Sequence, residues 1–206
     1  MLQRLTGLLL ACSLLTTSCN ENRKTEEKDS KDISEEHNKA KFESNDSEKD
    51  AHFMVEAAIT NLTEIQLGQL AQQKGTSSDV KELGKMMEKE HRASLAELKA
   101  LASKKVISIP DSSTEDVQAA YKKLNDKHGK DFDTEFCEQM VKGHKEAISS
   151  FEKESREGKD ADILTWTQNT LPVLRTHLEH AINCQERCNK DHKLIHHSAA
   201  LDTKVD

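Results

Sequence analysis

The chain has few of the residues from which β-sheets and their turns are built. Only 3% of its 206 residues are aromatic, and there are seven glycines and two prolines. Large β-sandwiches and Rossmann-type sheets are disfavoured, because their strands need β-branched and aromatic residues and their turns need Gly and Pro. With 34% hydrophobic and 33% charged residues, the composition predicts one all-α domain of modest size.

Several functional motifs are also missing. Acidic and basic residues are mixed along the chain at a net charge of −7, and no basic stripe suits it to nucleic acid, which is therefore not an expected partner. The sequence contains no Ser-His-Asp arrangement, no Gly-rich phosphate loop and no CxxC motif. Hydrolase, nucleotide-binding and thioredoxin functions have no support, and no catalytic residue is indicated.

Residues 1–18 are predicted to be a signal peptide. Arg4 precedes an apolar run that is too short to remain in a bilayer as a spanning helix, and small residues precede Cys19. Small residues before a cysteine are similar to a bacterial lipobox, in which the cysteine is acylated; simple secretion with cleavage nearby is the alternative. We expect an envelope lipoprotein, anchored to the outer membrane through lipid on Cys19 and facing the periplasm or the cell surface.

Two further segments are predicted to lie outside the folded domain. Residues 19–50 are expected to be a disordered acidic tether, because Ile33 and Phe42 are the only sizeable hydrophobic residues in most of this highly charged segment. Residues 191–206 are expected to be a polar, histidine-rich tail.

Residues 51–190 show helical periodicity and predict a four-helix bundle. The breaks between helices fall near residues 75–78, 106–130 and 157–160. Short connections predict two antiparallel helical hairpins, and the longer stretch between them predicts a crossover that carries a short extra helix.

Alternate spacings of three and four residues predict the helix faces that share the core. The first helix is apolar most of the way round, and we favour an inward position for its Glu64. The rows on the other three helices are Val80, Gly84, Met87, His91, Ser94, Leu98 and Leu101; Asp133, Cys137, Met140, His144, Ala147 and Phe151; and Ile163, Trp166, Thr170, Val173, His177, His180 and Cys184.

One polar residue of each helix lies near the middle of the predicted bundle. At about 1.5 Å per residue, Glu64, His91, His144 and His177 are at similar distances from their own turns. Imidazole and carboxylate are preferred ligands of zinc, iron, copper and manganese, so we expect a transition-metal site there. The alternative is a polar cluster that only fixes the register of the helices.

Further candidate ligands lie close to this set. Glu88 precedes His91 by three residues, and His180 follows His177 on the same predicted row; both are secondary candidates. Glu88 and His91 form the only Glu-x-x-His motif in the sequence. A di-iron site typically uses two such motifs and two further carboxylates, so the sequence offers too few carboxylates for one.

The cysteines allow two outcomes. An oxidising compartment permits a disulfide, and the hairpin register places Cys137 opposite Cys184, with Cys188 left free or paired with another molecule. Cys184 and Cys188 also belong to a run of His and Cys residues that recurs every four positions from His180 to His196 and that could hold a soft metal in twos or threes.

Separate motifs agree in order and spacing with a known family. They are Phe53 to Ala71, Val80-Lys81 with Met87 and His91, Phe132-Asp133 with Gly143-His144, and Thr170-Leu171-Pro172 with His177-Leu178. Over about residues 51–184 the chain resembles the bacterial envelope proteins grouped as domain of unknown function 4142. The resemblance implies a ferritin-like four-helix bundle behind a signal peptide and no assigned activity. Glu64, His91, His144, His177 and Asp133 fall on the motif positions.

The sequence as a whole predicts metal binding or metal handling in the bacterial envelope. The first alternative is a non-catalytic structural, stress or interaction module, with a protein partner or a second copy on an outer face. The second alternative is a di-metal oxidoreductase that acts on oxygen or peroxide.

Overall fold

The computed structural model describes residues 28–202, with side chains described up to Lys190. Six helices account for nearly all of this part: α1 (Ser30–Lys41), α2 (Asn45–Lys74), α3 (Ser78–Lys105), α4 (Glu115–Asn125), α5 (Gly129–Glu157) and α6 (Ala161–Asp202). The described residues contain no strand, which confirms the all-α prediction. The predicted signal peptide and Cys19 lie outside the described residues.

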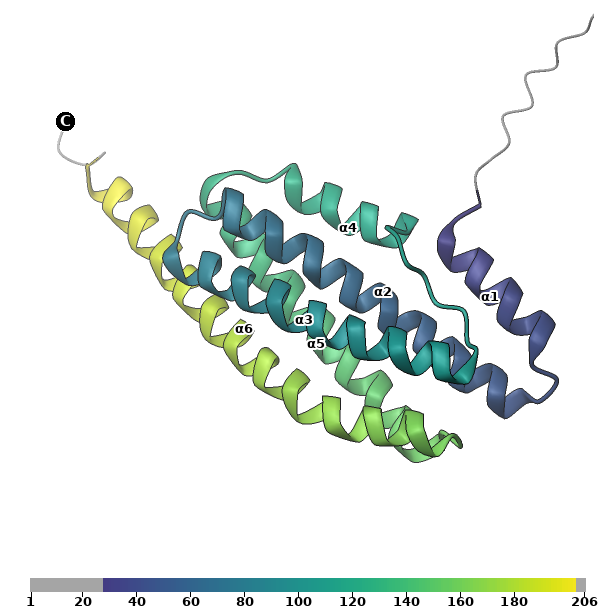
Figure 1. Ribbon diagram of the computed structural model, residues 1–206. Coiled ribbons are helices and arrows are strands. Elements are labelled where there is room, and N and C mark those ends of the chain that lie inside the picture. Colours follow the sequence, from purple (N-terminus) through teal and green to yellow (C-terminus); the bar gives the residue numbers. More distant parts are fainter. Residues whose placement is uncertain (1–27, 203–206) are drawn as a thin grey trace, which may run out of the picture.

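The four long helices lie side by side (Figure 1). α2 packs mainly on α3 and α5 mainly on α6, and the two pairs meet through contacts of α2 with α5 and of α3 with α6. Three-residue connections join the helices of each pair, so each pair is an antiparallel hairpin. The crossover between the hairpins carries the short helix α4, which packs against α2 and α5, as the sequence predicts.

The prediction of a disordered tether is wrong for residues 30–50. α1 occupies most of this segment, and α2 already begins at Asn45. Polar anchors hold α1 where apolar residues are scarce: Asp29 caps its first turn by accepting from the Lys31 amide, and Asn38 exchanges two hydrogen bonds of 2.7 and 2.8 Å with the backbone of Ser108. The low hydrophobicity of the segment does not reveal such polar anchors, and for this reason the helix was not predicted.

The predicted boundary at residue 190 does not coincide with a helix end. α6 continues to Asp202 and runs past the ends of the other helices (Figure 1). No helix in the described part of the chain combines the length and the apolar character that a membrane span requires.

The core has two large apolar clusters and a small third one, formed by Val55, Ile59 and Val117. One large cluster gathers residues such as Met87, Phe136 and Met140, and the other large cluster gathers residues such as Phe53, Phe151 and Trp166. On α3, α5 and α6 a single buried histidine separates the segments that enter each cluster. The core therefore consists of two apolar halves with a polar layer between them.

The two hairpins cap each other's turns. The carboxylate of Asp133, on α5, accepts hydrogen bonds from the amides of Thr76 and Ser77 in the turn before α3. The carboxylate of Asp50, on α2, accepts from the amides of residues 159–160 in the turn before α6. These backbone donors lie just before the first turns of α3 and α6, where they have no partner within the helix.

The two caps occupy equivalent positions in their hairpins. Asp50 and Gly75 of the first hairpin have the same separation as Asp133 and Gly158 of the second, and both glycines are the C-cap residues of their helices. Each cap therefore ties one hairpin to the turn of the other.

The predicted rows are accurate on α5 and drift on α6. All six predicted residues of α5 are buried, whereas Val173 of α6 is 43% exposed and His180 is exposed, with Leu174 and Ala181 buried in their place. A strict alternation of three and four residues has a mean period of 3.5, so it rotates away from the contact face of a long straight helix with 3.6 residues per turn.

Candidate metal centre

Three histidines meet in the polar layer of the core. His91 comes from α3, His144 from α5 and His177 from α6, and their exposed fractions are only 3%, 1% and 2%. One ring nitrogen from each lies within 4.8 Å of the others, and the ring centroids are 5.2–5.5 Å apart. We call these three residues the histidine triad.

Asn61 of α2 determines which nitrogen of His91 carries a proton. The Asn61 side-chain amide donates to the carbonyl of Ala57 at 2.9 Å, which directs its Oδ1 to Nδ1 of His91 at 3.0 Å. Because Oδ1 can only accept, Nδ1 of His91 must be the donor. Nε2 of His91 is then a bare acceptor, and it is buried with no hydrogen-bond partner.

The other two histidines are oriented in the same manner. Nδ1 of His144 donates to the carbonyl of Met140 at 2.9 Å, and Nε2 of His177 donates to a carboxylate oxygen of Glu90 at 2.7 Å. The remaining nitrogens, Nε2 of His144 and Nδ1 of His177, face each other at 3.3 Å. In neutral rings both of these atoms carry lone pairs.

The spacing of the facing nitrogens suits a shared cation. Two ligands bound at about 2.0–2.1 Å in tetrahedral geometry lie about 3.3 Å apart, which matches the pair formed by His144 and His177. Metal-binding histidines almost always donate the second ring N–H to a carboxylate, a carbonyl or water. All three members of the triad have such an acceptor.

Burial keeps two members of the triad, His91 and His144, in the form that binds metals. Desolvation lowers the pKa of His91 well below its usual value, with further lowering by the two neighbouring histidines. Desolvation also lowers the pKa of His144 to about 4. These two rings are therefore neutral at physiological pH, which is the state in which imidazole binds metals.

Glu64 lies beside the triad and not within it. Its side chain is buried as predicted, with Oε1 3.8 Å from Nδ1 of His144, the nitrogen that faces away from the other rings. Its carboxylate is not part of the close group of ligand atoms. Oε2 has no hydrogen-bond partner, and desolvation raises the pKa of Glu64 to about 8, so the buried group is a neutral acid at physiological pH.

The two secondary candidates do not reach the triad. Glu88 accepts hydrogen bonds from Gln69, Gln72 and Arg92, and His180 is exposed on α6. A Glu-x-x-His spacing alone does not bring both side chains to one point, because the carboxylate here is drawn to amide and guanidinium donors.

Asn61 and Glu90 were not predicted from the sequence. Asn61 lies in a largely apolar stretch of α2, residues 53–62, and this was a usable signal because a buried amide requires partners. Glu90 lies next to His91 in the chain and off the predicted row, so no periodicity argument assigns it to a histidine of α6.

A second group of metal-binding side chains consists of three cysteines. The sulfurs of Cys137 and Cys184, the predicted disulfide pair, lie 3.0 Å apart, and Cys188 is 3.8 Å from Cys137. All three thiols are buried and free in the structure. The sequence thus located the pair, and the structure adds Cys188 to it.

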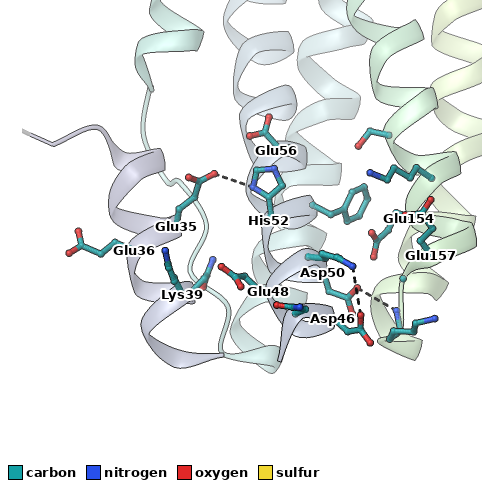
Figure 2. Close-up of a pocket in the computed structure, with 18 of the residues that line it drawn as sticks. Glu35, Glu36, Lys39, Asp46, Glu48, Asp50, His52, Glu56, Glu154 and Glu157 are labelled. Carbon is teal, nitrogen blue, oxygen red and sulfur yellow. Dashed lines mark hydrogen bonds and ion pairs between the residues drawn. The ribbon is translucent and has the colours of Figure 1, made fainter. Parts of the chain in front are cut away.

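A third group lies at the surface. Figure 2 shows a hollow between α1, α2 and the end of α5, in which Nδ1 of His52 contacts Glu35 at 3.1 Å and Glu56 lies close by. His52 is exposed. Asp50 and Glu154 line the same hollow.

The fold and the triad define the class of this protein: an all-helical protein with a candidate metal centre in a polar layer of its core. The chain belongs to the family described as Domain of unknown function (DUF4142), whose model matches residues 35–184. The match confirms the resemblance stated from the motifs and begins within α1. No curated protein and no solved structure matches the chain.

Proposed function

We propose that this chain is a lipid-anchored envelope protein that binds one transition-metal ion through His91, His144 and His177. The scaffold is a ferritin-like four-helix bundle. Two antiparallel hairpins joined by one long crossover support this assignment, because ferritin-like bundles combine one such connection with metal sites between facing helices.

The observation that carries the proposal is the pattern of hydrogen bonds around the triad. Each histidine gives one N–H to an acceptor outside the triad. The other nitrogens of His144 and His177 face each other at 3.3 Å, and one ring nitrogen of each histidine lies within 4.8 Å of the others. A layer that served only to fix helix register would satisfy its buried nitrogens, yet Nε2 of His91 has no partner.

The ligand set favours particular metals. Neutral imidazoles suit zinc, copper and iron better than they suit manganese, which prefers oxygen ligands. With three protein ligands, a zinc ion would keep one position for water or another ligand and would lower the pKa of that water. Because all three side chains are deeply buried, we favour holding or transferring the ion over turnover of a bulky substrate.

Elemental analysis tests the proposal directly. The full chain, purified without a polyhistidine tag and reconstituted with zinc, copper, iron or manganese, should retain one equivalent more than His177→Ala does. The matched control is His180→Ala, which removes an exposed histidine one turn further along α6. Equal metal content in the two variants, or no retained metal in the wild type, would contradict metal binding and would leave the triad with a purely structural role.

The membrane anchor is a separate part of the proposal. It rests on the residues before Cys19, and it predicts that the wild-type chain incorporates labelled fatty acid and sediments with membranes. Cys19→Ser should abolish both fatty-acid incorporation and sedimentation with membranes. Cys12→Ser, which changes the cysteine within the apolar run, should leave both unchanged. A Cys19→Ser chain that still carries label would contradict the assignment.

A further inference from the structure

The three buried cysteines form a compact sulfur cluster away from the triad. Cys184 and Cys188 are one turn apart on the same face of α6, and Cys137 of α5 packs against both. The exposed fractions are 0% for Cys137, 1% for Cys184 and 9% for Cys188, so only Cys188 approaches the surface. All three sulfurs lie within 4.8 Å of one another.

The three sulfurs form one connected group. The Cys137 sulfur lies 3.0 Å from the sulfur of Cys184 and 3.8 Å from the sulfur of Cys188. Cysteine binds metals as the thiolate, so a cation bound by this group would replace thiol protons.

We propose that Cys137, Cys184 and Cys188 form a second metal site, which takes a soft monovalent cation, Cu(I). Thiolates select soft ions such as Cu(I) and Zn(II). Structural zinc sites take four ligands, whereas Cu(I) is satisfied by two or three sulfurs. Among the described side chains, no fourth His, Cys, Asp or Glu joins the group, so the set is too small for a closed zinc site.

The cysteine site is separate from the triad. Cys137 precedes His144 on α5, and Cys184 follows His177 on α6, by two helical turns in each case, which corresponds to about 10 Å along the axes. Met87 and Met140 pack in the apolar cluster that contains the cysteines. The two sites share no ligand, so either proposal can fail without the other.

A competition titration tests the cysteine site. The full chain, reduced and kept free of oxygen, is titrated with Cu(I) in the presence of the chromogenic chelator bicinchoninate. The wild type should withhold one equivalent more from the chelator than Cys188→Ser does, and it should show a sulfur-to-copper absorption band in the near ultraviolet. Cys188→Ser should lose the band and weaken apparent affinity by more than about tenfold, because it removes a direct ligand.

Two controls separate loss of ligand from loss of fold. Val141→Ala truncates a buried neighbour of Cys137 on α5 and should keep Cu(I) binding. His177→Ala should also keep the absorption band, because it affects only the triad. Far-ultraviolet circular dichroism confirms the fold of each variant, and Cys137→Ser replaces Cys188→Ser if the latter fails to fold.

The outcomes that overturn the proposal are specific. A reduced chain in which all three thiols react as free but which withholds no Cu(I) would overturn it. A folded Cys188→Ser chain with unchanged affinity and an unchanged absorption band would overturn it as well. In His177→Ala, which lacks the triad site, equal retention of Zn(II) in competition with Cu(I) would overturn the assignment of the cysteine site to copper.

Discussion

Asn61→Ala is the substitution that best separates a metal site from a polar layer that only fixes helix register. Asn61 touches no metal in either case; it accepts from Nδ1 of His91 and leaves the buried Nε2 as the nitrogen available to a metal. Without the Asn61 side chain, the buried Nδ1–H of His91 has no hydrogen-bond acceptor. The apo protein should lose about 1–3 kcal/mol of unfolding free energy, the usual penalty for an unpaired buried donor.

The effect on metal binding follows from the same hydrogen bond. Loss of a group that orients a ligand weakens metal affinity by about 10- to 100-fold. At a free metal concentration of about 100 times the wild-type Kd, bound metal stabilises the wild type by about 2.7 kcal/mol, and a 30-fold weaker site leaves about 0.9 kcal/mol. The metal-induced rise in Tm should therefore fall from roughly 5–10 °C to roughly 2–3 °C.

Thermal melts with and without metal measure both effects, and Asn38→Ala provides a matched control. Asn38 is 4% exposed, as is Asn61, and it makes two hydrogen bonds far from the triad. It should lower Tm by a similar amount with and without metal. If Asn61→Ala also leaves the metal-induced shift at the wild-type size, the assignment of His91 as a ligand is refuted.

Three further predictions use other contacts. Glu90→Gln should weaken metal binding about tenfold, measured by calorimetry, while Glu88→Gln leaves it unchanged. Burial, with Asp50 nearby, raises the pKa of Glu154 to about 7, so this group should lower stability by about 2 kcal/mol as pH rises from 4.5 through 7. In chemical denaturation at several pH values, Glu154→Gln should remove that contribution from the wild-type pH profile; an unchanged profile contradicts the assignment. Gly68→Ala places a Cβ 2.6 Å from the backbone oxygen of Gly84 on α3, so it should lower the free energy of unfolding by about 1–3 kcal/mol. A variant with wild-type stability would show that α2 and α3 can move apart without cost.

The sequence predicted the fold class and the three histidines for one reason. Burial along a helix follows a simple period, so His91, His144 and His177 were recognisable as polar residues at apolar positions. Comparing their distances from the turns then placed them at one level. The family model matched the same region of the chain.

The rest of the site depends on side-chain directions that periodicity does not give. Glu64 was predicted to face inward and does, yet its carboxyl lies against the outer nitrogen of His144. Glu90 reaches a histidine on another helix from a position next to His91. α1 was missed because polar anchors, and not apolar residues, attach it to the domain.

The pair formed by His144 and His177 makes the strongest case for a cation in the core. Their outer nitrogens donate to Met140 and Glu90, so two lone pairs face each other at 3.3 Å when both rings are neutral. A shared proton would relieve this pair, but burial lowers the pKa of His144, and one proton would still leave Nε2 of His91 without a partner. A single metal ion satisfies all three nitrogens at once, and no arrangement of protons on the triad does so.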